Sequence, residues 1–241
     1  MAGLVLLLRL SLRVRPRDFP GIWFSLAWLA FYLGGQIAFF PLLGLLPGFK
    51  PAESVLADMF LAGIPVLMAG MLGFRRQPWG RPFAWPFHLG TKRRTVGLCL
   101  LGLAFLWLFD WAYMGLVECI THRPAPVQDI LLLLKSALKA HPLAAFLAVA
   151  IMGPVVEEIL FRGLLHGALE KQLPTGATII LTSVIFALYH FQMVFFIPLF
   201  GVGLLLGWAR SKTGAIGLPI LIHAVNNGFF LLLVIWGRNG S

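Results

Sequence analysis

Long apolar runs separated by short polar segments are the main feature of this sequence. Runs such as 95–116 and 214–236 reach the ~20 apolar residues that a helix needs to cross the hydrocarbon core of a bilayer. Backbone polar groups in lipid must be bonded within the protein, and the chain shows little of the alternation typical of a barrel. The pattern therefore predicts seven membrane-spanning helices, near 20–46, 53–74, 95–118, 142–169, 174–191, 192–210 and 213–236.

Proline and glycine mark the ends of these segments, as expected of residues that start or stop helices. They stand at Pro47, Pro51, Pro78, Pro82, Pro142, Pro174 and Gly214. Segment 127–140 is rich in leucine but too short and too charged to cross, so we expect it to lie on the membrane surface. Gly203 and Gly207 are four residues apart, which indicates a helix face that a neighbouring helix can approach closely.

Composition agrees with a membrane protein. The chain is 59% hydrophobic and only 12% charged, which makes a water-soluble fold a poor fit. Residues 1–19 contain several arginines and lack a small-residue cleavage site, so they resemble a basic interfacial segment more than a signal peptide. The net charge of +10 does not indicate nucleic acid as a partner, because the basic residues lie at the ends of the apolar runs.

The distribution of lysine and arginine predicts the orientation of the chain in the membrane. If the chain crosses seven times, most of its lysines and arginines lie on the same side of the membrane as the N-terminus: Arg9, Arg13, Arg15, Arg17, Arg75, Arg76, Arg81, Lys92, Arg93, Arg94, Lys171, Arg210 and Lys212. The smaller group lies on the other side: Lys50, Arg123, Lys135, Lys139 and Arg238. Because cytoplasmic loops are enriched in these residues, we expect a multi-pass protein with a cytoplasmic N-terminus.

The fourth span carries two acids and one base, Glu157, Glu158 and Arg162. Each charge at membrane depth costs ~2.5–3.5 kcal/mol on insertion scales, so some compensation is required. Glu158 and Arg162 are four residues apart on one helix face, and a structural ion pair is the simpler interpretation for them. Glu157 points about 100° away and has no partner of this kind, which makes it a candidate general base.

Histidine and asparagine occur on two later spans. His190 ends the fifth span, where a single histidine is more often a packing or hydrogen-bonding residue than a catalytic one. His223 and Asn227, four residues apart in the seventh span, share one face and indicate a polar cavity, with interhelical hydrogen bonding as the less favoured alternative. Ser183 is the nearest hydroxyl to His190, and such a hydroxyl usually bonds to its own helix backbone.

The three patterns together resemble the CAAX-processing endopeptidases and their prokaryotic relatives, the CPBP family with its bacteriocin-processing and immunity members. The resemblance rests on Glu157-Glu158-x-x-x-Arg162, Phe186-x-x-x-His190 and His223-x-x-x-Asn227, in the family's order, over about 143–233. It implies a glutamate-type intramembrane endopeptidase without a metal cofactor. Glu157 and His190 would activate water, His223 and Asn227 would stabilise the oxyanion, and Glu158 and Arg162 would support them.

The apolar pattern predicts an all-α, polytopic transmembrane bundle of about seven spans plus interfacial helices. We expect one domain over 1–241, made of the basic N-terminal segment (1–19), an accessory transmembrane region (20–141) and a catalytic transmembrane core (142–241). Lipid and a peptide or protein substrate are the expected partners. That substrate would be lipidated, a leader peptide, or a protein with a C-terminal membrane anchor.

Three other interpretations of the same residues remain open. One carboxylate and two imidazoles also suit a zinc peptidase with an open coordination position. The polar groups could instead bind a client helix in a non-enzymatic immunity or assembly protein. A proton-relay transporter fits less well, because the chain shows no inverted halves. Asp110, in the middle of the third span, belongs to none of the motifs and indicates either a pair with a motif residue or a separate polar site.

Overall fold

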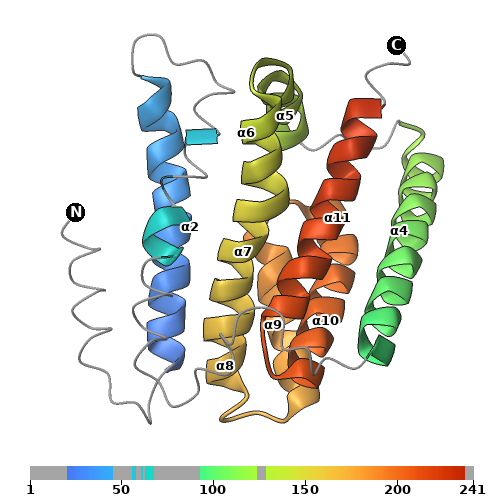
Figure 1. Ribbon diagram of the computed structural model, residues 1–241. Coiled ribbons are helices and arrows are strands. Elements are labelled where there is room, and N and C mark those ends of the chain that lie inside the picture. Colours follow the sequence, from blue (N-terminus) through green and yellow to red (C-terminus); the bar gives the residue numbers. More distant parts are fainter. Residues whose placement is uncertain are drawn as a thin grey trace.

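The computed structural model describes residues 21–45, 56–57, 61, 63–67, 93–123 and 129–236. All regular structure in these residues is helical, and the long helices run side by side as a bundle (Figure 1). The helices outside the centre are α2 (Ile22–Gly44), α4 (Arg93–Thr121), α5 (Asp129–Ala140), α9 (Thr175–Tyr189), α10 (Phe196–Thr213) and α11 (Gly217–Trp236). The predicted all-α class is confirmed for this part of the chain.

One long helix, Pro142–Leu169, runs through the middle of the bundle and is called the central helix below. It consists of α6 (Pro142–Phe146), η1 (Leu147–Met152), α7 (Gly153–Glu158), η2 (Ile159–Leu165) and α8 (His166–Leu169). In η1 and η2 the backbone is wound more loosely, with hydrogen bonds of the π type. Such interruptions redirect side chains and free backbone carbonyls, and they are frequent at functional sites.

Four helices are long and apolar enough to cross a membrane: α4, the central helix, Met193–Thr213 and Gly217–Ile235. Met193–Thr213 joins α10 to the short 3-10 helix η3 (Met193–Phe195). Two shorter apolar helices, Ile22–Ile37 within α2 and Thr175–Tyr189, lie among them. The fold is therefore that of a helical membrane protein, while seven crossings stay a prediction. Most of the predicted second span (53–74) and the basic segment (1–19) lie outside the described residues.

Three of the predicted proline and glycine boundaries can be compared with the described helices, and they agree, whereas Pro47, Pro51, Pro78 and Pro82 lie outside the described residues. Pro142 occupies the first turn of the central helix, where its missing N–H has no intrahelical partner to lose. Pro174 immediately precedes α9 with extended backbone angles. Gly214 ends α10 in the left-handed conformation, φ 67°, which glycine adopts without a Cβ penalty.

The first half of the chain packs against the motif-bearing half through α2. Trp28 and Tyr32 of α2 are buried in one apolar cluster with Phe161 of the central helix and Phe186 of α9. At the other end of the central helix, α5 buries residues such as Leu138 against α6 and α11. These contacts fix the central helix from both sides, although they do not test the predicted surface location of α5.

Helices α9 and α10 approach each other most closely at Gly203. A Cβ built on Gly203 would lie 2.9 Å from Ser183 Cβ and 3.0 Å from Ser183 Cα. At Gly207 the corresponding contact, with Ile179 Cγ2, is 3.2 Å. The predicted small-residue face is therefore present, and α9 is the helix that uses it.

We expect Gly203→Ala to destabilise the protein by about 1–3 kcal/mol, because the added methyl group meets backbone that cannot move aside. Thermal unfolding in detergent micelles measures the effect. Gly201→Ala is the matched control on the same helix, since its Cβ would meet only the end of the flexible Leu106 side chain, at 2.9 Å. Equal melting temperatures for the two variants would contradict the predicted close contact.

Candidate active site

Glu157 lies between two histidines that come from two other helices. Its Oε2 atom is 3.9 Å from His190 Nε2, at the end of α9, and 3.8 Å from His223 Nε2, on α11. Oε2 is buried and makes no hydrogen bond among the described residues. The side chains of Glu157 and His190 remain 16% and 25% exposed, so a molecule from outside can reach this pair. Three helices thus bring their ionisable groups to one point.

His190 is fixed by the carbonyl of its own helix. Its Nδ1 lies 2.8 Å from the carbonyl oxygen of Phe186, which can only accept a hydrogen bond. Nδ1 must therefore carry a proton, and in the neutral ring Nε2 presents a lone pair towards Glu157. Helix α9 ends at this point, and Phe191 then takes the left-handed conformation, φ 54°. The chain thus turns away directly after the histidine.

His223 is held by the second acid of the motif. Its Nδ1 lies 2.9 Å from Glu158 Oε1, and the same oxygen accepts a hydrogen bond of 2.8 Å from Arg162. The predicted pair of Glu158 and Arg162 is confirmed, and both side chains are completely buried. Glu158 Oε1 therefore serves as the acceptor for both Arg162 and His223, and this contact fixes the orientation of the His223 ring.

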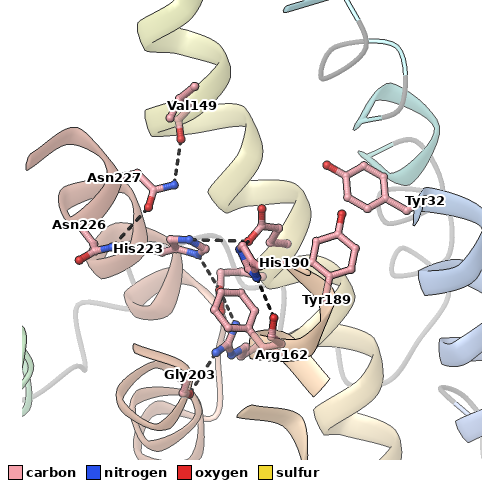
Figure 2. Close-up of polar contacts among 12 residues, drawn as sticks. Tyr32, Val149, Arg162, Tyr189, His190, Gly203, His223, Asn226 and Asn227 are labelled. Atoms are coloured by element: carbon pink, nitrogen blue, oxygen red, sulfur yellow. Dashed lines mark hydrogen bonds and ion pairs between the residues drawn. The ribbon is translucent and has the colours of Figure 1, made fainter. Parts of the chain in front are cut away.

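Arg162 has two further partners that fix it in place. It donates a hydrogen bond of 3.1 Å to the carbonyl of Gly203 on α10, and its guanidinium lies 4.6 Å from the centre of the Phe186 ring. Figure 2 shows Arg162 and its hydrogen bond to Gly203 below His190 and His223. The ion pair of Glu158 and Arg162 therefore connects the central helix to α9, α10 and α11 at the level of Glu157.

Asn227 stands one turn after His223 on α11 and faces the central helix (Figure 2). Its Nδ2 donates a hydrogen bond of 3.1 Å to the carbonyl of Val149 in η1. That carbonyl is free because the Gly153 N–H bonds to Ala148 instead and Pro154 has no N–H. The loose winding before Pro154 thus creates the acceptor that positions Asn227, and the second Nδ2 hydrogen is left for another acceptor.

Two other candidate residues do not join this group. The Ser183 hydroxyl donates a 2.6 Å hydrogen bond to the carbonyl of Ile179 on its own helix, as predicted. Asp110 Oδ1 on α4 is buried and makes no hydrogen bond among the described residues, and no motif residue is bonded to it. Within the same described part of the chain, no group of three His, Cys, Asp or Glu side chains is arranged to hold a metal ion.

Sequence reasoning missed several polar contacts around the site. Trp107 donates a 2.9 Å hydrogen bond to Asn226, the neighbour of Asn227. Arg210 donates to the carbonyl of Arg162 at 3.2 Å and to Glu170 at 3.3 Å, which supports the central helix from α10. The contact between Asn226 and Trp107 joins residues 119 positions apart, so spacing within one helix gives no signal for it.

A second set of polar contacts that sequence reasoning missed joins α2 to Tyr189, the neighbour of His190. The Tyr189 hydroxyl donates to Gln36 Oε1 at 2.6 Å, and Gln36 Nε2 donates to the Tyr32 hydroxyl at 3.2 Å. Tyr32 and Tyr189 also stack, with ring centres 6.2 Å apart (Figure 2). The accessory half of the chain therefore forms one side of the surroundings of His190.

Comparison with known proteins places these motifs in a family. Residues 139–229 match the family model described as type II CAAX prenyl endopeptidase Rce1-like. The chain is 29% identical over 149 residues to the membrane-embedded CAAX protease MroQ of Staphylococcus aureus (strain USA300). It is 25% identical over 145 residues to a Bacillus subtilis (strain 168) protein named "Putative membrane peptidase YdiL".

These alignments cover only part of this chain and only part of either relative. They span 58% and 59% of this chain, respectively, and 59% of each relative. No solved structure matches the chain. The matched segment contains all six motif residues, Glu157, Glu158, Arg162, His190, His223 and Asn227. The predicted resemblance is confirmed: residues 139–229 of this chain are similar to the type II CAAX prenyl endopeptidase Rce1-like family, and one relative is named a membrane-embedded CAAX protease.

Proposed function

We propose that this protein is an intramembrane endopeptidase that hydrolyses a peptide bond of a membrane-associated or lipidated protein. The observation that carries the proposal is the position of Glu157 Oε2, buried, without a hydrogen bond and 3.8–3.9 Å from two imidazole nitrogens. A carboxylate placed in this way can take a proton from water. In this proposal residues 142–241 form the catalytic core, residues 20–141 the accessory region, and the N-terminus is cytoplasmic.

The proposed reaction uses water as the nucleophile. Glu157 accepts one proton of the water while His190 Nε2 accepts a hydrogen bond from the other, and the hydroxyl oxygen attacks the scissile carbonyl carbon. The resulting oxyanion accepts hydrogen bonds from protonated His223 and from Asn227 Nδ2. When the tetrahedral intermediate collapses, the C–N bond breaks and the leaving amine takes the proton from Glu157.

Glu158 supports this scheme through charge. To donate from Nε2 while Nδ1 donates to Glu158, His223 must be an imidazolium. In this scheme the Glu158 carboxylate, 2.9 Å from Nδ1 and bonded to Arg162, lies beside the positive ring as its acceptor. Neither Glu158 nor Arg162 needs to touch the substrate, which agrees with their complete burial.

Cleavage of defined peptides in lipid–detergent micelles tests the proposal. The probes are a farnesylated peptide ending in Cys-aliphatic-aliphatic-Met, the same peptide without farnesyl, and a peptide with a C-terminal membrane anchor. We expect the purified protein to cut at least one of them, and mass spectrometry of the products identifies the bond. Failure of the folded protein to cut any of the three would contradict the proposed activity.

Metal removal tests whether the reaction needs a metal, and Ser183→Ala tests whether the nucleophile is water and not that hydroxyl. We expect cleavage to continue at more than about half its rate after dialysis against EDTA and 1,10-phenanthroline, and likewise in Ser183→Ala, because the mechanism uses neither a metal nor that hydroxyl. Activity that is lost with the chelators and restored by zinc would assign the reaction to a zinc peptidase. Loss in Ser183→Ala alone would indicate a covalent serine nucleophile.

A further inference from the structure

A chain of three hydrogen bonds leads from α4 to the carbonyl of Val149 and passes through both asparagines of α11. Trp107 Nε1 donates to Asn226 Oδ1 at 2.9 Å, and Asn226 Nδ2 donates to Asn227 Oδ1 at 3.4 Å. Asn227 Nδ2 then donates to the Val149 carbonyl at 3.1 Å. Figure 2 shows the hydrogen bonds that join Asn226, to the left of His223, with Asn227 and Val149 above it.

The donor-to-acceptor direction of these three hydrogen bonds is fixed at both ends of the series. An indole N–H can only donate, so Asn226 must turn its oxygen to Trp107 and its NH2 group to Asn227. A backbone carbonyl can only accept, so Asn227 must turn its NH2 group to Val149, whose usual helical donor, the Gly153 N–H, bonds to Ala148 instead. Each asparagine amide therefore has one allowed orientation.

This orientation matters because the oxygen and nitrogen of an amide are almost identical in shape. Packing alone does not distinguish the two orientations of Asn227, whereas the hydrogen bonds do. If Asn227 turned over, it would present a carbonyl oxygen to the oxyanion and repel it. Trp107, acting through Asn226, thus favours the same orientation of the Asn227 amide as the Val149 carbonyl does.

Trp107 is held firmly enough to act in this way. Its ring stacks on Phe229 of α11, with centres 3.8 Å apart and planes at 14°. It also belongs to the apolar cluster of Cys99, Leu103 and Leu206 that joins α4 to α10. Trp107 lies outside the matched segment 139–229, so the accessory region supplies it.

We propose that Trp107 is a positioning residue that orients the amide of Asn227, through Asn226, so that its N–H groups face the scissile carbonyl. The inference rests on the proposed function, in which Asn227 is an oxyanion donor. It assigns the accessory transmembrane region a direct part in setting the active site, besides packing. Trp107 itself touches neither the substrate nor the reacting atoms.

Trp107→Phe tests this inference, because phenylalanine keeps an aromatic ring beside Phe229 and removes the N–H. With the cleaved peptide among the three probes, we expect kcat to fall about 10- to 100-fold while KM stays within about twofold, less than the ~10²–10³ for removing an oxyanion donor outright. In an Asn227→Ala background the same change should have no further effect on kcat. Trp111→Phe is the matched control on the same helix, since Trp111 is 76% exposed.

A second measurement needs no substrate. In the NMR spectrum of the protein in micelles, labelled with ¹⁵N at asparagine, Trp107→Phe should shift the Asn227 side-chain amide signals, and Trp111→Phe should leave them in place. Unmoved Asn227 signals would overturn the inference. So would a wild-type kcat, or a loss of kcat that persists unchanged in the Asn227→Ala background, because the latter is a general structural effect.

The two proposals fail in different ways. If Glu157→Gln is inactive and Trp107→Phe behaves as wild type, the positioning role is wrong and the peptidase remains. If none of the three probes is cut, or Glu157→Gln cuts as fast as wild type, the proposed function is wrong. In that case the NMR measurement alone decides whether Trp107 orients Asn227.

Discussion

Glu157→Gln is expected to lower the rate of peptide cleavage by at least about 10³-fold and to leave substrate binding almost unchanged. The amide has nearly the size of the carboxylate but cannot take a proton from water, and general base catalysis contributes typically 10²–10⁴-fold. The variant should also keep its melting temperature, because Glu157 Oε2 has no hydrogen bond to lose among the described residues. Initial rates on the cleaved probe and thermal unfolding measure both.

Glu118→Gln is the control for charge. It makes the same chemical change at an exposed position on α4 and should cut at the wild-type rate. In cells, a peptide that accumulates uncut with Glu157→Gln and not with Glu118→Gln identifies the natural substrate. If Glu157→Gln and His190→Ala both insert normally and keep the biological function, the polar groups serve a non-enzymatic membrane protein instead.

Glu158→Gln is expected to destabilise the protein by about 3–5 kcal/mol, the usual cost of removing one partner from a buried ion pair. Glu158 and Arg162 have no exposed side-chain surface, so the remaining guanidinium would stay buried without its counter-charge. Activity should fall as well, because the amide stabilises a protonated His223 less than the carboxylate does. Thermal or denaturant unfolding in micelles measures the first effect, and cleavage the second.

Glu158→Gln combined with Arg162→Met separates the effect on stability from the effect on activity. Replacing both charges removes the unpaired buried ion, and exchanging a buried pair for apolar groups is often neutral. We expect the double variant to regain most of the stability lost in the single variant, while cleavage stays low. A single variant as stable as wild type would show that the pair does not balance charge in the core. Full activity in the double variant would remove Glu158 from the proposed mechanism.

The sequence alone determines the features that depend on local pattern. Apolar runs of sufficient length require helices in lipid, and proline and glycine fix boundaries such as Pro142, Pro174 and Gly214, because each acts on its own backbone. The pair of Glu158 and Arg162 is equally local, since four residues bring two side chains to the same helix face. Order and spacing of the three motifs also suffice for the family resemblance.

Only the tertiary structure decides which of the polar groups meet. Glu157 lies between His190 and His223 because three separate helices pack at particular heights and rotations, and no spacing within one helix encodes those relations. The contact of His223 with Glu158 and that of Trp107 with Asn226 arise in the same way. Pro154 is an intermediate case. The sequence shows directly that Pro154 has no N–H. Asn227 bonds to the free Val149 carbonyl, however, only because of where α11 packs.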